Sequence, residues 1–167
     1  MLRALQYDNS SDNLTAGTRT LTCTVTDNQN GTAQAATTIS VGAVNDPPLA
    51  VDDTATTGEN TPIINGPSVL GNDSDPEGSA LVVVAIGTST PNTPVTGSSG
   101  GTFIIAADGT YSFDPGTAFD DLQVGETRQT SVTYTIEDTD GLRSTATLTI
   151  TVQGANDGAL NQEAKNA

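Results

Sequence analysis

Three acidic side chains stand at alternate positions in the segment NDSDPEG, residues 72–78: Asp73, Asp75 and Glu77. One Asp or Asn is enough for a tight turn, because a single side chain can accept the hydrogen bond of the backbone two residues on. Three neighbouring carboxylates repel one another, so a cation that offsets the repulsion is expected beside them. Ca²⁺ takes about six to eight oxygen ligands, and alternate acids followed by glycine can supply several of them. An EF-hand is excluded, since Val84 stands where its final glutamate would fall.

A second acidic group lies in the segment EDTDG, residues 137–141, which carries Asp138 and Asp140. If strand directions alternate, this segment lies at the start of the predicted domain. It would meet Asn45 and Asp46 of the incoming chain there. Asp-Gly also forms turns readily, so the alternative is a plain turn with solvated carboxylates.

The same reasoning places residues 72–78 at the opposite end of the domain. They would lie there with Glu59, with the connection at 120–121, and with Asn156 and Asp157 of the outgoing chain. Two acidic groups, each beside a linker, would let calcium set the angle between neighbouring domains. The candidate calcium ligands are Asp46, Glu59, Asp73, Asp75, Glu77, Asp138, Asp140, Asn156 and Asp157.

The charge balance excludes several classes of function. The chain of 167 residues carries 20 acidic side chains against 5 basic ones, for a net charge of −15. Binding to nucleic acid or to an anionic membrane surface needs clusters of basic residues, and the sequence has none. The sequence contains no His, which excludes imidazole zinc sites and His-based catalysis. No apolar run approaches the roughly 20 residues of a membrane span, so no membrane insertion is expected.

Alternation of apolar and polar residues predicts an all-β fold. The segments SVTYTIED (131–138) and TATLTITV (145–152) place apolar side chains on one face and Ser or Thr on the other, as half-buried antiparallel strands do. Asp108-Gly109 predicts a hairpin turn within residues 102–115. Strands are expected near 49–57, 61–64, 80–87, 93–97, 102–107, 110–114, 128–137 and 143–153, the first two as halves of one edge strand. About seven strands in one domain suit a Greek-key sandwich of the immunoglobulin type.

Two segments of the sequence recur at a fixed spacing. TLTCTVTD (20–27) is similar to SVTYTIED (131–138), and VGAVND (41–46) is similar to VQGAND (152–157), in both cases 111 residues later. The constant spacing predicts tandem homologous domains of about 111 residues. Cys23 aligns with the inward Tyr134 and is therefore expected to be a small buried hydrophobe.

The repeat divides the chain. We expect the C-terminal part of a truncated repeat at 1–44, a linker at 45–48, a complete sandwich at 49–157 and a tail or next linker at 158–167. The truncated part cannot close a sandwich. It is therefore expected to be partly disordered, or to be ordered only by pairing with another chain, which would give a homodimer.

The ordered set of motifs resembles a known family. FDDLQVGETRQTSVTYTIEDTDGLRSTATLTITVQGAND resembles the second half of the VCBS-type, bacterial cadherin-like repeat, and AVNDPPLAVDDTATTGENTP with VLGNDSDPEGSAL resembles its first half. LRALQYDNSSDNLTAGTRTLTCTVTD is similar to the end of a related repeat. Two features depart from the pattern: GANDG replaces a proline-bearing junction, and Gln29 interrupts the acidic run after Asp27.

The resemblance implies a calcium-stiffened spacer repeat in a large secreted adhesin of the RTX type, on the surface of a Gram-negative bacterium and active in adhesion and biofilm formation. Its partners would be neighbouring repeats of the same chain. One alternative is a module that binds a carbohydrate or a protein, which an exposed cluster of aromatic side chains would support. Another is homotypic association through β edges. An enzyme is not expected, because the paired carboxylates lie in turns without the walls of a cleft.

Overall fold

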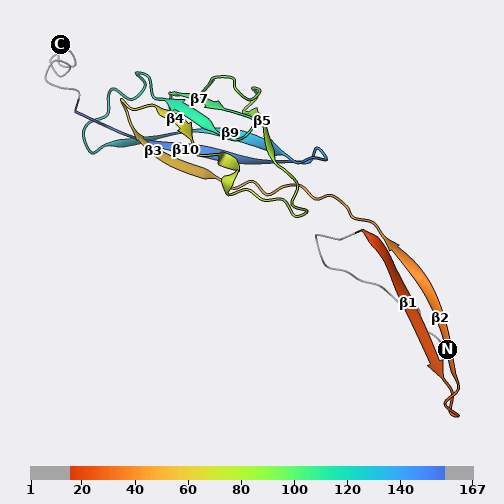
Figure 1. The fold of residues 1–167 in the computed structure, drawn as a ribbon. Helices are drawn as coiled ribbons and strands as arrows, with labels where there is room; N and C mark the ends of the chain where they lie inside the picture. The colour runs from red at the N-terminus through yellow and green to blue at the C-terminus, as the bar shows by residue number, and fades with distance from the viewer. Residues whose placement is uncertain (1–15, 157–167) are drawn as a thin grey trace. The chain divides into compact units, whose positions relative to one another are not determined.

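The computed structural model describes residues 16–156 (Figure 1). The chain divides into two compact units, residues 1–46 and 47–167. Its extended elements are all β-strands, and the one helical element among the described residues is the 3-10 turn η1 (Val69–Gly71). No helix in residues 16–156 is long and apolar enough to cross a membrane. The predicted all-β class is confirmed.

The described part of the first unit is one antiparallel hairpin. It consists of β1 (Gly17–Thr26) and β2 (Thr32–Val41). Asp27 shapes the turn between them, because its Oδ1 accepts hydrogen bonds from the backbone N–H groups of Gln29 (2.9 Å) and Gly31 (2.7 Å). Alternating threonines, whose branched side chains suit a pleated strand, account for the extended conformation.

The two faces of this hairpin differ in chemistry. Leu21, Cys23 and Val25 lie on one face of β1, whereas the intervening positions are threonines. The hairpin is a two-stranded sheet of its own, so no second layer from the described part of the first unit covers the apolar face. Cys23 is consequently exposed, and the prediction that it is buried is wrong.

The second unit contains a hairpin with the same strand pairing. There β9 (Thr127–Glu137) pairs with β10 (Arg143–Gln153). Cys23 is opposite Ala35 in the first hairpin, and Tyr134 is opposite Ala146 in the second. Tyr134 and Ala146 each stand 111 residues after their counterparts in the first hairpin. The segments that recur in the sequence therefore adopt the same register.

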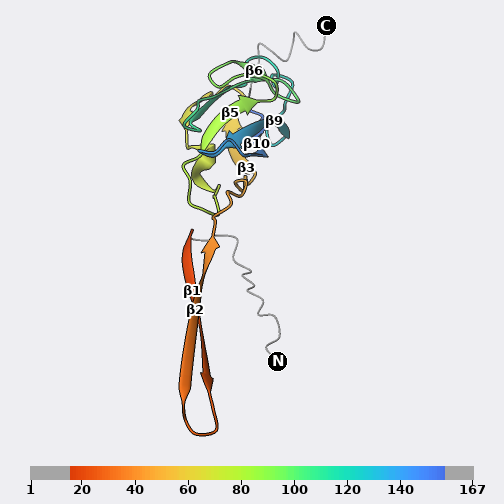
Figure 2. The same cartoon turned by 90° about the vertical axis from the view of Figure 1, so that its right-hand side faces the viewer.

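Two four-stranded sheets make up the second unit. Their orders are β3-β10-β9-β5 and β4-β8-β7-β6, and Figure 2 shows β3, β10, β9 and β5 side by side. The remaining strands are β3 (Asp53–Gly58), β4 (Ile63–Gly66), β5 (Val82–Ile86), β6 (Val95–Thr96), β7 (Thr102–Ile105) and β8 (Tyr111–Asp114). Strand β3 runs parallel to β10, and the other pairs are antiparallel. Gly109 lies in the predicted β7–β8 turn with a φ of 82°.

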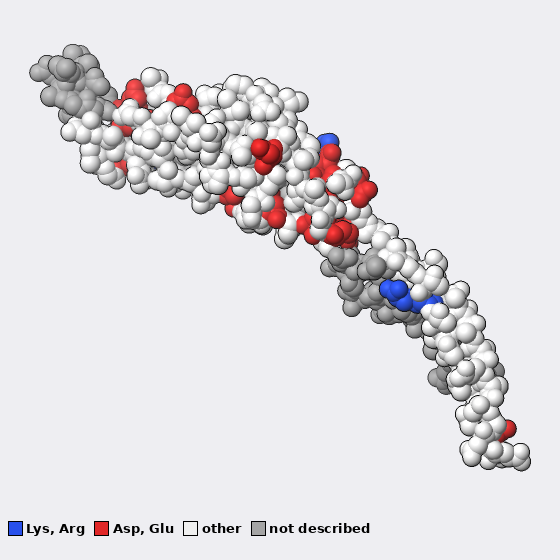
Figure 3. All heavy atoms as spheres, in the orientation of Figure 1, with Lys and Arg blue, Asp and Glu red and all other residues white. Residues whose placement is uncertain are grey.

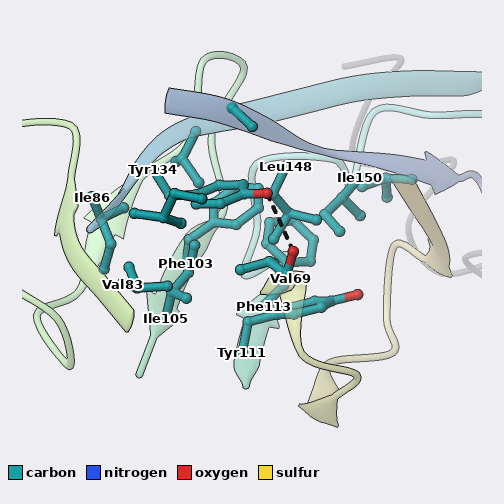
Figure 4. Close-up of a cluster of buried hydrophobic side chains, with 14 of the residues drawn as sticks. Val69, Val83, Ile86, Phe103, Ile105, Tyr111, Phe113, Tyr134, Leu148 and Ile150 are labelled. Atoms are coloured by element: carbon teal, nitrogen blue, oxygen red, sulfur yellow. Dashed lines mark hydrogen bonds between the residues drawn. The ribbon is translucent and has the colours of Figure 1, made fainter. Parts of the chain in front are cut away.

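The core lies between these sheets (Figure 4). Inward positions of the strands provide aliphatic and aromatic side chains, as the alternating pattern predicts. The rings of Phe103 and Phe113 pack with centroids 4.6 Å apart and planes tilted by 50°. Figure 4 labels Val69, Val83, Ile86, Phe103, Ile105, Tyr111, Phe113, Tyr134, Leu148 and Ile150.

The chain reverses direction between β3 and β4. A turn closes at Thr61, whose N–H donates to the Gly58 carbonyl at 3.0 Å. Strand β3 then pairs with β10, and β4 pairs with β8 in the other sheet. The prediction that these segments are halves of one edge strand is wrong, because the turn sends β4 back toward the start of the unit.

Candidate metal sites

The second unit has two ends that carry the candidate ligands. We call them the proximal pole, with residues 49–53, 72–79 and 138–142, and the distal pole, with residues 58–61, 120–126 and 154–156. The first set is joined by the pairing of Val82 with Glu137 and by the bridge between Leu49 and Ser74. The second is joined by two backbone bonds, from the Glu59 N–H to the Gln153 carbonyl (2.9 Å) and from the Gly154 N–H to the Glu126 carbonyl (3.0 Å).

The segment 72–78 lies at the proximal pole. Leu49 and Ser74 exchange backbone hydrogen bonds of 2.8 and 3.1 Å, and Asp73 Oδ1 accepts the Val51 N–H at 2.8 Å. The prediction that this segment lies at the end where the chain leaves the unit is therefore wrong. The reversal at Gly58–Thr61 is the cause, since it adds one strand direction before the loop.

Two carboxylates of this segment have one oxygen engaged and one buried without a partner. Asp75 Oδ1 accepts the N–H groups of Glu77 (3.0 Å) and Ser79 (2.9 Å), which holds the loop in a tight turn. Asp75 Oδ2 and Asp73 Oδ2 are buried and have no hydrogen-bond partner among the described residues. Buried polar oxygens are nearly always satisfied, so these two atoms are candidates to bind an ordered water or a cation.

Asp138 is buried in the β9–β10 turn at the same pole. Only 4 % of this residue is exposed. Its Oδ1 accepts the N–H groups of Asp140 (2.8 Å) and Leu142 (2.9 Å), which is the arrangement of Asp27 in the first hairpin. Asp138 thus forms the turn, and the structure brings it and Asp140 to the pole that holds Asp73 and Asp75.

Asp53 is a member of the proximal pole that sequence reasoning missed. The Tyr134 hydroxyl donates to Asp53 Oδ2 (2.8 Å) and lies 3.1 Å from the Val51 carbonyl. Burial raises the pKa of Asp53 above its ordinary value, and the Tyr134 hydrogen bond opposes that rise. Burial also raises the pKa of Asp73, against the bond from Val51. An inward tyrosine needs a partner for its hydroxyl, and that need was the signal in the sequence.

Glu59 is the main feature of the distal pole. It is 1 % exposed, and its Oε1 accepts the Ala155 N–H at 2.8 Å. Its Oε2 is buried without a hydrogen-bond partner among the described residues. Asn156 follows directly in the chain, whereas Asp157 lies outside the described residues. The structure therefore brings Glu59 to the outgoing segment, as expected.

Asp121 at this pole is engaged by an arginine. Both of its oxygens accept from the Arg128 guanidinium, at 3.0 Å for Oδ1 and 2.6 Å for Oδ2. The same guanidinium donates to the Ala118 carbonyl (3.2 Å) and lies 5.9 Å from the centroid of the Phe119 ring.

Comparison with known proteins defines the family. A sequence model described as a bacterial cadherin-like domain matches residues 45–154. The chain belongs to the bacterial cadherin-like domain family. A search of curated proteins finds no match. The resemblance predicted from the motifs is confirmed.

Solved structures similar to this cadherin-like chain include extracellular cadherin domains. Protocadherin gamma B7 domains 1–4 match with 18 % identity and a TM-score of 0.46, over 84 % of this chain and 33 % of that one. Mouse protocadherin-24 domains 1–3 match with 17 % identity and a TM-score of 0.39, over 89 % and 49 %. A nucleoside hydrolase-related protein from Saccharophagus degradans matches with 14 % identity and a TM-score of 0.41, over 66 % and 26 %. The chain spans about a third of the length of the first structures it matches.

The donor chemistry of the cadherin-like domain fits a hard cation. The candidate ligands at both poles offer oxygen only, which suits Ca²⁺ rather than zinc or copper. No three acidic side chains in residues 16–156 converge as a ready metal-binding group. A bound ion therefore needs backbone carbonyls, amide oxygens or water in addition to these carboxylates.

The structure gives less support to a ligand-binding module. Five aromatic side chains of the described residues are buried: Phe103, Tyr111, Phe113, Phe119 and Tyr134. The sixth, Tyr7, lies outside the described residues. A shallow groove of about 240 Å³ lies over β4, β7 and β8, lined by Asn65, Asn92, Ile104, Ala106, Thr110, Tyr111 and Ser112. No exposed aromatic cluster that would favour sugar stacking is present among residues 16–156.

Proposed function

We propose that the cadherin-like domain of this chain is a calcium-binding structural repeat that extends a bacterial adhesin. The observation that carries the proposal is a set of three buried carboxylate oxygens without hydrogen-bond partners among the described residues: Asp73 Oδ2, Asp75 Oδ2 and Glu59 Oε2. Leaving charged oxygens buried and unpaired is costly, and a cation that they coordinate offsets that cost.

The proximal pole would supply most of the ligands. Asp73 and Asp75 each have one oxygen directed away from the backbone bonds that hold the other. Glu77, Asp138 and Asp140 are proposed with them because they lie at the same pole. We add Asp46 on the sequence alone, since it immediately precedes the second unit.

The distal pole would hold a second site around Glu59. Asn156 and Asp157 are proposed as its partners, since they follow the residue whose N–H already bonds to Glu59. Sites at both poles would tie each repeat to its neighbours and stiffen the chain. Extracellular calcium modules bind with dissociation constants of about 10⁻⁴–10⁻³ M. At a tenfold excess of calcium, one such site adds about 1.4 kcal/mol.

Location and partners follow from the same proposal. We infer that the chain is secreted to the cell surface, that neighbouring repeats are its partners, and that it has no catalytic role. The net charge of −15 supports this interpretation, because calcium outside the cell would neutralise part of the repulsion between repeats.

Thermal unfolding tests the calcium proposal. The melting temperature of the full chain should rise by about 5 °C with saturating calcium relative to excess chelator, given the stabilisation expected from one site. The double variant Asp73→Asn with Asp75→Asn should lose most of this rise. Asp114→Asn is a matched control, since Asp114 is an exposed carboxylate that caps a turn through the Gly116 N–H at 2.9 Å. Equal melting temperatures with calcium and chelator would show that the acidic loops are plain turns.

A second role is favoured by the first hairpin. The face of β1 that carries Leu21, Cys23 and Val25 is open within the described part of the first unit, and Val25 is 54 % exposed. We propose that two copies of the chain associate through this face, as a homotypic contact.

A further inference from the structure

Arg128 occupies an unusual place for a charged residue. It stands on β9 two positions before the buried Thr130 and opposite Val152, which is fully buried in the core. Its guanidinium therefore closes the distal end of the core over Phe119, 5.9 Å from the ring centroid. The arginine is also fixed by the Ala118 carbonyl at 3.2 Å.

The contact with Asp121 uses both ends of the carboxylate. Oδ1 and Oδ2 each accept one guanidinium N–H, at 3.0 and 2.6 Å, in the bidentate geometry that arginine forms best. The side chains are 36 % and 64 % exposed, so their attraction is screened and contributes little to stability. The pair instead determines what Asp121 can bind, because the Arg128 guanidinium already occupies both of its carboxylate oxygens.

The proximal pole is built differently. Asp73 and Asp75 take these hydrogen bonds from backbone N–H groups, which bring no formal positive charge to the carboxylates. Arg143, which begins β10 directly after the proximal pole, bonds to Glu137 at the end of β9 rather than to either of them.

We propose that Arg128 is a built-in counter-ion that keeps Asp121 from binding a divalent cation. The inference rests on the proposed calcium function and refines it. The Asp121 carboxylate at the distal pole is then withheld from a cation by the protein itself, and the site proposed there forms around Glu59. The two ends of the domain therefore differ in their demand for calcium.

Calcium stoichiometry on the full chain tests the proposal, measured by equilibrium dialysis at neutral pH. Asp121→Asn should bind as many ions as the wild type, since Asp121 is not a ligand. Arg128→Met keeps an apolar stem over Phe119 and should bind one additional ion with a roughly millimolar dissociation constant. The additional ion should be lost when Arg128→Met is combined with Asp121→Asn. Arg143→Met removes the same charge at the other pole and should gain no ion that depends on Asp121.

Two outcomes would overturn the proposal: fewer ions in Asp121→Asn than in the wild type, or no additional ion in folded Arg128→Met. Asp121→Asn changes one exposed atom and decides the question even if Arg128→Met fails to fold. Failure of the calcium function itself would be separate, since it would show as a wild type that binds no calcium.

Discussion

Asp73 faces two opposing demands at the proximal pole. Its carboxylate is needed to hold the loop to Val51 through the 2.8 Å bond, and yet burial and the nearby Asp53 raise its pKa. Tyr134 partly relieves Asp53 through a hydrogen bond of 2.8 Å. In chelator, the carboxylate charges at this pole therefore lower the stability of the fold. A cation bound here would offset the repulsion between them.

Acid titration in chelator should reveal this cost. Because the pKa of Asp73 is raised in the folded state, ionising its carboxylate lowers the free energy of unfolding at a pH above that pKa. This loss of stability disappears as the pH falls below the ordinary value near 3.8, where the carboxyl is protonated in both states. Asp73→Asn should thus melt above the wild type at neutral pH, and the difference should shrink on acidification. Asp108→Asn should show the opposite sign, because hydrogen bonds from Thr110 lower the pKa of Asp108. A variant Asp73→Asn that melts below the wild type in chelator at neutral pH would contradict this account.

At the scale of the element, the sequence predicted the positions of strands better than the positions of loops. The alternating pattern placed β7 to β10 within a few residues, because each strand buries one face and the period of two is strong. The reversal at Gly58–Thr61 carries no such pattern, and it moved the segment 72–78 to the other pole. The sequence placed Glu59 beside the outgoing segment, as the structure does, but it did not single out Asp53 as a member of the proximal pole.

The β7–β8 turn supports the acidic loop through η1. The Val69 N–H donates to the Gly109 carbonyl at 3.0 Å, and a Cβ at Gly109 would lie 2.3 Å from Ser68 Oγ. Gly109 also has a φ of +82°. Gly109→Ala should therefore cost about 1–3 kcal/mol and reduce the calcium-dependent rise in melting temperature.

Gly116→Ala is the matched control for that measurement. Its φ is also positive, at +57°, but a Cβ there would meet nothing within 4 Å. It should cost less and leave the calcium response unchanged. Similar calcium responses in the two variants would mean that η1 does not support the loop.

At the scale of the whole molecule, charge is distributed unevenly along the chain. Residues 17–41 carry one acidic and one basic side chain, Asp27 and Arg19, while the remaining sequence holds the net charge of −15. Figure 3 shows that most of the acidic side chains visible on its face lie on the second unit. Two hairpins could thus meet without net repulsion. A two-stranded hairpin is at best marginally stable by itself, so burial of its apolar face against a second copy would stabilise it.

Sedimentation velocity at increasing concentration tests this association. The wild type should form dimers, and Leu21→Asp should abolish them by placing a charge on the apolar face. Thr22→Asp places the same charge on the opposite face of β1 and should leave the dimers intact. A wild type that stays monomeric up to about 100 μM would contradict homotypic association. A dissociation constant of that size corresponds to a binding free energy of only about 5–6 kcal/mol.

The parallel pairing of β3 with β10 has a mechanical consequence. These are the first and last strands of the domain, and they are joined side by side along six residue pairs, from Leu148–Asp53 to Gln153–Gly58. A tether that pulls on the start of β3 and on the end of β10 slides the two strands past each other. The backbone hydrogen bonds between β3 and β10 are then loaded in shear, so they bear the force together and do not break one after another. The proposed role as an extender repeat would use this resistance to tension along the domain.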